Sequence, residues 1–250
     1  MNSTSPITGA RPEGTQTEID AATNVQRMFD TIAPTYDRAN HLLSFGLDRL
    51  WWRRSARVLR PILSNPQARI LDLCCGTGDM TAALLQYRPA GGKPVLGGDF
   101  APEMLARARA KHARANARFL EADALHLPFS PGSFDLVTFA FGFRNLANYA
   151  DGLAAVHRVL APGGEIAILE CNQPGGLTGA LYSLYFKRVL PILGGLISGF
   201  PAAYRYLPAS VERFPRPPRM LMLLHEAGFS NARWFGYTFG TAGLYRGTKT

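Results

Sequence analysis

Three acidic residues stand where strands would end in this chain of 250 residues. Asp72 lies in the apolar run ILDL, Asp99 closes the next apolar run, VLGGD, and Asp123 follows a third run, ARFLE. In an open parallel sheet the carboxyl ends of the strands meet at one edge, where a carboxylate after the second strand holds ribose hydroxyls. The pattern therefore predicts a site for a ligand that contains a ribose.

A glycine pair, Gly76-Thr77-Gly78, follows the first acid and precedes an expected helix that begins at Asp79. Glycines let the backbone approach a ligand closely. The dinucleotide form of this turn has a third glycine, but Thr81 occupies that position, and Asp79 would repel a phosphate. A ribose-containing cofactor without a phosphate fits better, and S-adenosylmethionine is such a molecule. The alternative is an ordinary turn with glycines for tightness.

Further polar residues lie near these acids. Asp123 is placed to accept from an adenine amino group, with the backbone of Ala124 meeting a ring nitrogen; alternatively, Asp123 caps a turn. Arg144 and Asn145, in the run AFGFRN, follow the fourth expected strand, at the edge where ligands bind. A structural alternative is that Arg144 pairs with an acid such as Asp37.

The N-terminal segment is a second source of polar side chains, because Tyr36, Asp37, Asn40 and His41 cluster on one expected helical turn. Such a segment is able to close over a site at the sheet edge. A lone histidine is more often a structural residue than a functional one.

Alternating apolar runs and helical patterns indicate an α/β fold with a mostly parallel sheet covered on both faces. The expected strands cover 69–73, 94–98, 117–121, 134–140 and 165–170, with two more at 229–237 and 244–247. The expected helices cover 19–30, 36–60, 79–87, 101–114, 148–160 and 217–227. Residues 1–18 are expected to form a disordered tail and residues 19–250 one domain, whose N-terminal part, 19–60, is a helical cap.

Residues 177–207 form an unusually apolar segment within a late insertion expected over 171–216. Lys187, Arg188 and Pro191 interrupt the run, so it does not read as a membrane span. We expect one or two short amphipathic helices over the strand ends. They serve either as a lid that packs on the sheet, or as a wall for an apolar substrate that touches an anionic membrane through Lys187 and Arg188.

The net charge of +9 would suit nucleic acid or an anionic membrane. No interleaving of aromatic and basic residues suggests a nucleic-acid platform, so we expect no nucleic-acid partner. Cys74, Cys75 and Cys171 form no C-x-x-C pattern and have no histidine pair nearby, which predicts no metal site and favours a reduced, cytoplasmic setting. We also consider a homodimer.

Six motifs together resemble the ubiquinone/menaquinone biosynthesis C-methyltransferase family, over about residues 25–248. They are FDTIAPTYDRANHLLSFGLDRLWW, LDLCCGTGDMT, FGFRN, HRVLAPGG, AYRYLPASVERFP and AGF. The glycine turn and HRVLAPGG are shared with many class I methyltransferases. The cap motif, FGFRN and AYRYLPASVERFP are more specific.

The resemblance implies a seven-stranded Rossmann-like sheet of the class I methyltransferase type, with S-adenosylmethionine as methyl donor. It implies methyl transfer to a ring carbon of a prenylated quinol. The paired Cys74-Cys75 looks like members that act on demethylmenaquinol, although a benzoquinol of the ubiquinone pathway stays open. The family often has a serine where this chain has Ala140. The expected cofactor-binding residues are Asp72, Gly76, Thr77, Gly78, Asp99, Phe100, Asp123, Ala124 and Ala140.

The implied chemistry needs a ring hydroxyl to lose its proton, which makes the ring carbon nucleophilic. We expect Arg144 to stabilise the resulting phenolate. A water held by Arg144, Asn145 and Tyr36 would take the proton, or His41 would act as the base. Two rival interpretations are a methyltransferase for another acceptor, such as a phospholipid amine or a natural-product ring, and a non-catalytic nucleoside-binding or nucleic-acid-binding module.

Overall fold

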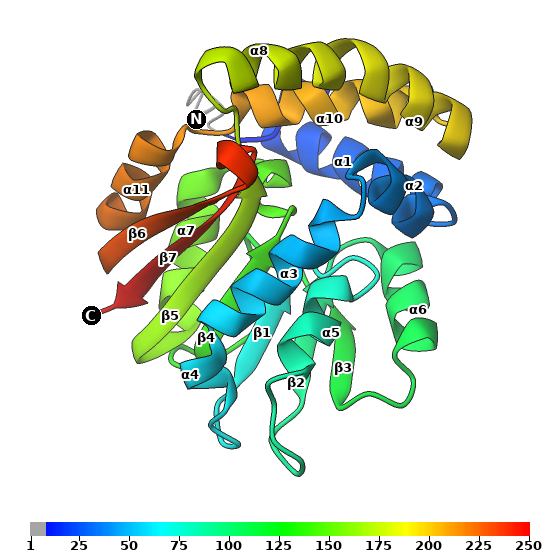
Figure 1. Cartoon of the computed structure of the whole chain (residues 1–250). Helices are drawn as coiled ribbons and strands as arrows, with labels where there is room; N and C mark the ends of the chain where they lie inside the picture. The colour runs from blue at the N-terminus through cyan, green and yellow to red at the C-terminus, as the bar shows by residue number, and fades with distance from the viewer. Residues whose placement is uncertain (1–8) are drawn as a thin grey trace.

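A computed structural model of the chain describes residues 9–250, apart from the side chains of Leu177, Leu181, Ile197 and Ser198. Within this range seven strands form one sheet (Figure 1). The strands are β1 (Ile70–Leu73), β2 (Val95–Asp99), β3 (Ala117–Glu121), β4 (Phe134–Ala140), β5 (Leu160–Cys171), β6 (Phe229–Tyr237) and β7 (Ala242–Lys249). Their order is β3-β2-β1-β4-β5-β7-β6, and β7 runs antiparallel to both of its neighbours. This confirms the expected mostly parallel sheet.

The strand order reverses between β1 and β4, which pair in parallel with Leu73 opposite Phe139. The chain leaves both strands at the same edge, β1 into the glycine turn and β4 into the loop that holds Arg144. Ligands of open α/β sheets bind at such a reversal point. The fold therefore brings the two most informative motifs of the sequence side by side.

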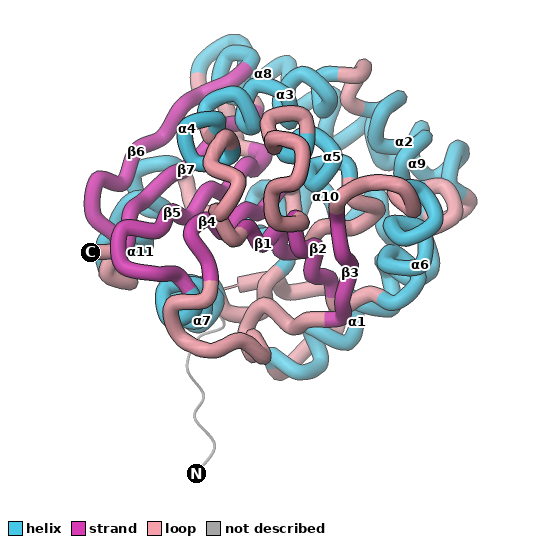
Figure 2. Tube along the Cα trace, turned by 90° about the horizontal axis from the view of Figure 1, so that it is seen from below, coloured by secondary structure: helices cyan, strands magenta, loops and turns pink. Residues whose placement is uncertain are grey.

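Helices cover both faces of the sheet (Figures 1 and 2). The helices of one face are α3 (Leu47–Val58), α4 (Arg60–Leu63) and α5 (Asp79–Leu85), and those of the other are α7 (Tyr149–Val159) and α11 (Pro217–Glu226). Helix α6 (Pro102–Lys111) packs on β2 and β3. The central strands β1 and β4 are buried on both sides, which explains their nearly continuous apolar runs.

A layer of helices lies across the carboxyl ends of the strands, at the top of Figure 1. It combines α1 (Glu18–Ile32) and α2 (Tyr36–Leu43) with the late segment, which forms α8 (Gly176–Leu184), a π-helical turn (Tyr185–Val189), α9 (Leu190–Ser198) and α10 (Pro201–Arg213). Ala39, Leu43, Leu190 and Tyr204 share one apolar cluster, so the two parts form a joint roof. No helix in the described range is long and apolar enough to cross a bilayer.

Two expectations about the N-terminal region were wrong. The expected helix 36–60 is divided, because Phe45 and Gly46 adopt left-handed backbone conformations with φ of 53° and 73°. The expected tail is shorter than 1–18, since Ala10 is 1% exposed and its N–H donates to the carbonyl of Leu146 at 2.7 Å. The rest of that tail, residues 1–8, lies outside the described residues.

Candidate active site

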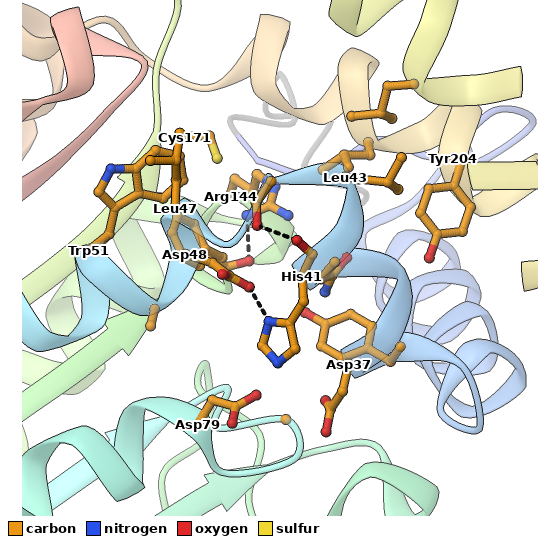
Figure 3. Close-up of a pocket in the computed structure, with 18 of the residues that line it drawn as sticks. Asp37, His41, Leu43, Leu47, Asp48, Trp51, Asp79, Arg144, Cys171 and Tyr204 are labelled. Carbon is orange, nitrogen blue, oxygen red and sulfur yellow. Dashed lines mark hydrogen bonds and ion pairs between the residues drawn. The ribbon is translucent and has the colours of Figure 1, made fainter. Parts of the chain in front are cut away.

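A cavity of about 310 Å³ lies between the strand ends and the roof (Figure 3). Four parts of the chain line it: the cap, the glycine turn after β1, the loop after β4 and the late helices. Most of its wall is apolar and aromatic, with Trp51 and Tyr204 among the lining residues. A few polar or charged side chains, including those of His41 and Arg144, reach into this apolar space, as in sites that bind small molecules.

The glycine turn has the backbone that its sequence predicts. Gly76 and Gly78 have φ of 54° and 88°, and a Cβ at Gly78 would lie 2.7 Å from the ring of His112. The Gly76 N–H donates to Oδ2 of Asp99 at 2.8 Å, and Oδ1 of Asp99 accepts from the Ala101 N–H at 2.9 Å. Burial raises the pKa of Asp99 to about 6. Asp99 thus ties the end of β2 to the turn after β1.

The other two strand-end acids have different surroundings. Asp72 is fully buried, and its carboxylate oxygens accept from the hydroxyls of Thr81 and Thr138 at 2.6 and 2.7 Å, so it anchors the base of α5. Asp123 is half-exposed and accepts from the Leu125 N–H at 2.9 Å, which is the turn-capping role considered above. None of the three strand-end acids, Asp99 included, lines the cavity.

The mouth of the cavity at the glycine turn is acidic. Asp37 of α2 and Asp79 of α5 both line it, and both accept from Nζ of Lys111, at 2.8 and 2.6 Å. The hydroxyl of Thr77 donates to Asp37 at 2.6 Å. Burial opposes ionisation of Asp37, but the hydrogen bonds from Lys111 and Thr77 lower its pKa. Two carboxylates beside Thr77 suit a cationic donor without a phosphate.

Arg144 pairs with an acid, as the structural alternative above expected, but the partner is Glu170 and not Asp37. Nη1 of Arg144 donates to Oε1 of Glu170 at 2.6 Å and to the carbonyl of Phe141, and its Nε donates to Ser210 at 3.3 Å. Burial works against the guanidinium charge, yet the Glu170 carboxylate raises the pKa of Arg144. The side chain lines the cavity as a fixed cation.

Asn145 and Tyr36 also line the cavity, but their settings differ. Oδ1 of Asn145 accepts from the hydroxyl of Tyr206 at 3.1 Å, so the amide holds a residue of α10 against the loop. The ring of Tyr36 stands over the glycine turn, 4.0 Å from where a Cβ of Gly76 would lie. Burial raises the pKa of the Tyr36 phenol.

The loop after β4 is strained and tightly packed. Phe141 has a φ of 59°, unfavourable for an aromatic residue, and its ring lies 5.9 Å from that of Trp51. A Cβ at Gly142 would lie 2.2 Å from the Cβ of Cys74, in the turn after β1. Ala140 and Phe141 thereby form part of the cavity wall.

His41 makes a short contact that the sequence did not suggest. Its Nδ1 lies 2.5 Å from Oδ2 of Asp48, and both residues line the cavity (Figure 3). Asp48 follows the break at Phe45-Gly46, so the turn between α2 and α3 brings the two side chains together.

Sequence reasoning missed Glu170 and Asp48. Glu170 closes the apolar run IAILE of β5, and an acid at that position could have been recognised as a buried partner. Asp48 carried no comparable signal, because its role depends on the helix break. Among the described residues, no group of three or more His, Cys, Asp or Glu side chains is placed to hold a metal ion.

Comparison with known proteins identifies the family of the chain. The chain matches the ubiE/COQ5 methyltransferase family over residues 16–249. The chain belongs to this family. A demethylmenaquinone methyltransferase of Thermus thermophilus is 52% identical over 225 residues, which cover 89% of this chain and 100% of that protein. One of Deinococcus radiodurans is 46% identical over 233 residues, covering 92% and 94% of the two chains.

Solved structures of methyltransferases share the fold of this family member. A SAM-dependent methyltransferase of Thermotoga maritima superposes with a TM-score of 0.64 at 18% identity, over 90% of this chain and 99% of that chain. One of Aquifex aeolicus gives a TM-score of 0.57 at 18% identity, over 81% and 93%. The chain is therefore a methyltransferase with the class I Rossmann-like sheet.

Proposed function

We propose that this enzyme transfers a methyl group from S-adenosylmethionine to a ring carbon of demethylmenaquinol. The observation that carries the proposal is a cavity that runs from the glycine turn to an apolar roof and is lined by Arg144. The names of the most similar relatives reported above point to the naphthoquinol rather than to a benzoquinol. An apolar roof suits a prenylated ring, whereas a phospholipid amine or another acceptor finds no specific support.

The carboxylates at the cavity mouth support the choice of donor. S-Adenosylmethionine supplies a methyl group on a positively charged sulfur, and a cation of this kind is compatible with Asp37 and Asp79. Asp99, buried at the end of β2, is our candidate for the ribose hydroxyls. The other residues proposed for the cofactor site are Gly76, Thr77, Gly78, Phe100, Asp123, Ala124 and Ala140. Asp72 is buried and contributes by holding the turn and not by contact with the cofactor.

We assign Arg144 to the reacting oxygen of the acceptor. A ring hydroxyl that loses its proton leaves a negative charge, which a fixed guanidinium in an apolar cavity stabilises more than water would. Proton removal belongs either to a water near Arg144, Asn145 and Tyr36 or to His41. The amide of Asn145 is already engaged with Tyr206 and Phe141, which leaves it less free to hold a water.

A direct assay tests the proposal. The purified enzyme is incubated with methyl-labelled S-adenosylmethionine and either reduced demethylmenaquinone or a demethylated benzoquinol, and the products are identified by mass. We expect the label on the ring of the naphthoquinol. Label on the benzoquinol alone, or on neither ring, would contradict the assignment.

We further propose that the roof contacts an anionic membrane, from which a prenylated substrate can enter. Phe45 and Leu196 are 77% and 78% exposed on neighbouring parts of the roof. Lys187 and Arg188 lie exposed on the π-helical turn between α8 and α9. Apolar side chains flanked by cations are typical of interfacial helices. A cytoplasmic location and a homodimer stay predictions.

A further inference from the structure

The contact between His41 and Asp48 has the geometry of a catalytic base with an orienting acid. Asp48 is 4% exposed, and its second oxygen, Oδ1, accepts from the Arg49 N–H at 2.7 Å. The carboxylate is therefore fixed on both sides, and its Oδ2 is left to accept from His41. Because a carboxylate is an acceptor, the proton of a neutral imidazole resides on Nδ1, and Nε2 carries a free lone pair.

The free nitrogen faces the site. In Figure 3 the second ring nitrogen of His41 points away from Asp48, toward the side of the cavity where Asp79 lies. Among the described residues, Nε2 has no hydrogen-bond partner. The edge of the His41 ring packs at 5.8 Å from the ring of Trp52, which holds the imidazole plane in place. The arrangement leaves one acceptor nitrogen at the side of the cavity where the glycine turn lies.

The other titratable groups of the cavity are poorly suited to accept a proton. Burial raises the pKa of Cys171, Tyr204 and Tyr206 to about 12, although Arg144 lowers the values of Cys171 and Tyr206, so these groups stay protonated near neutral pH. Asp37 and Asp79 are bound to Lys111. Arg144 is a cation. Of these titratable groups, His41 is the one left with an acceptor nitrogen that has no hydrogen-bond partner among the described residues.

We propose that His41 is the general base of the methyl transfer and that Asp48 is its positioning residue. This inference rests on the proposed function. The ring hydroxyl gives its proton to Nε2 of His41, and the electron pair of the O–H bond moves into the ring. A ring carbon bonds to the methyl group while the methyl–sulfur bond breaks, and that electron pair stays on sulfur. The methylated carbon then loses its hydrogen to water as a proton, and the ring oxygen regains a proton from His41. One proton is released overall.

Three variants test the two roles. His41→Ala removes the base, and we expect kcat to fall by about 10²- to 10⁴-fold while the affinity for S-adenosylmethionine, measured by calorimetry, stays unchanged. Added imidazole should restore part of the rate. His225→Ala, on the exposed face of α11, is the control and should retain the wild-type kcat.

Asp48→Asn tests positioning with almost no change in shape. The Arg49 N–H donates to the side-chain oxygen at this position, so it should orient the amide oxygen of the new asparagine toward Arg49. The NH₂ group then faces His41 and donates to Nδ1, which places the imidazole proton on Nε2. We expect ¹⁵N NMR of labelled histidine to report an Nδ1–H tautomer in the wild type and an Nε2–H tautomer in the variant, with kcat lowered by about tenfold or more.

The outcomes are distinct. A folded His41→Ala enzyme with wild-type kcat overturns the proposal, and so does an Asp48→Asn enzyme with a reversed tautomer and wild-type kcat. If His41→Ala does not fold, the Asp48→Asn result decides. A wild-type enzyme that methylates neither quinol contradicts the proposed function instead, while the NMR measurement still reports whether Asp48 fixes the ring.

Discussion

Glu170 binds both the side chain and the backbone of Arg144. Its Oε1 accepts from Nη1 at 2.6 Å, and its Oε2 accepts from the backbone N–H of Arg144 at 3.1 Å. The end of β5 therefore fixes both the path of the loop after β4 and the direction of its guanidinium. Both members of the pair are buried, so the loss of one partner leaves the other as an uncompensated charge.

Glu170→Gln should destabilise the protein by about 3–5 kcal/mol, because the buried guanidinium loses its carboxylate. Urea unfolding measures the change in the free energy of unfolding. Glu226→Gln is the matched control: Glu226 pairs with Arg219 on the surface of α11, where both side chains are about half exposed, and we expect a change of less than about 1 kcal/mol. If the two substitutions change the free energy of unfolding equally, the buried pair stabilises the protein no more than the surface pair does.

Arg144→Ala should lower kcat by about 10²- to 10³-fold, since the reacting oxygen loses its fixed cation. The affinity for S-adenosylmethionine should change little. Arg144→Lys keeps a charge next to Glu170 but lacks the second planar donor, so we expect it to recover only part of the rate. Steady-state kinetics and calorimetry separate the two effects, and unchanged turnover in Arg144→Ala would remove this residue from the mechanism.

Asp99→Ala should weaken the binding of S-adenosylmethionine by about tenfold or more, because a charge-assisted hydrogen bond to the ribose is lost. Glu121 is a suitable control, since it pairs in register with Asp99 on the neighbouring strand β3 but is exposed. Calorimetry with Glu121→Ala should give the wild-type affinity. Wild-type affinity in a folded Asp99→Ala protein would disprove the assignment.

Asp72→Asn should change the pH dependence of stability. Burial raises the pKa of Asp72 from 3.8 to about 6. The protonated carboxyl group therefore contributes fully to the free energy of unfolding below about pH 4, and this stability is lost as the pH rises through 6. Between pH 4 and 7 the free energy of unfolding of the variant should rise by about 2–3 kcal/mol relative to that of the wild type. Asp135→Asn should instead lose stability relative to the wild type as the pH rises, because the hydrogen bond from Arg69 lowers the pKa of Asp135 and so stabilises its ionised form in the folded protein. Urea unfolding at several pH values checks both.

The roof should bind anionic vesicles, and less so as the salt concentration increases. Leu196→Ser removes an exposed apolar side chain of α9 and should weaken co-sedimentation with such vesicles. Met222→Ser makes a similar change on α11, where Met222 is 54% exposed, and should bind like the wild type. Equal binding by all three proteins would rule out this face as the contact surface.

The sequence predicted the parts of the site that depend on local spacing. The glycine turn, Asp99 and the loop with Arg144 follow from strand-end patterns, and the structure brings them to one edge of the sheet. The partners that orient the charged groups were harder to predict. Glu170 is 26 residues from Arg144 and meets it only because β4 and β5 are neighbours. Asp48 reaches His41 only because the chain turns at Phe45-Gly46, and that turn divides a segment whose pattern predicts one continuous helix.

The absence of one carbon atom at position 142 sets how close the chain segments leaving β1 and β4 can approach. A methyl group there would collide with Cys74 and push the two segments apart, along with the guanidinium and the glycine turn that they carry. The φ of Gly142 is −111°, which any residue can adopt, so crowding alone excludes larger residues. A library that places all twenty amino acids at this codon should consequently return glycine almost exclusively among active clones.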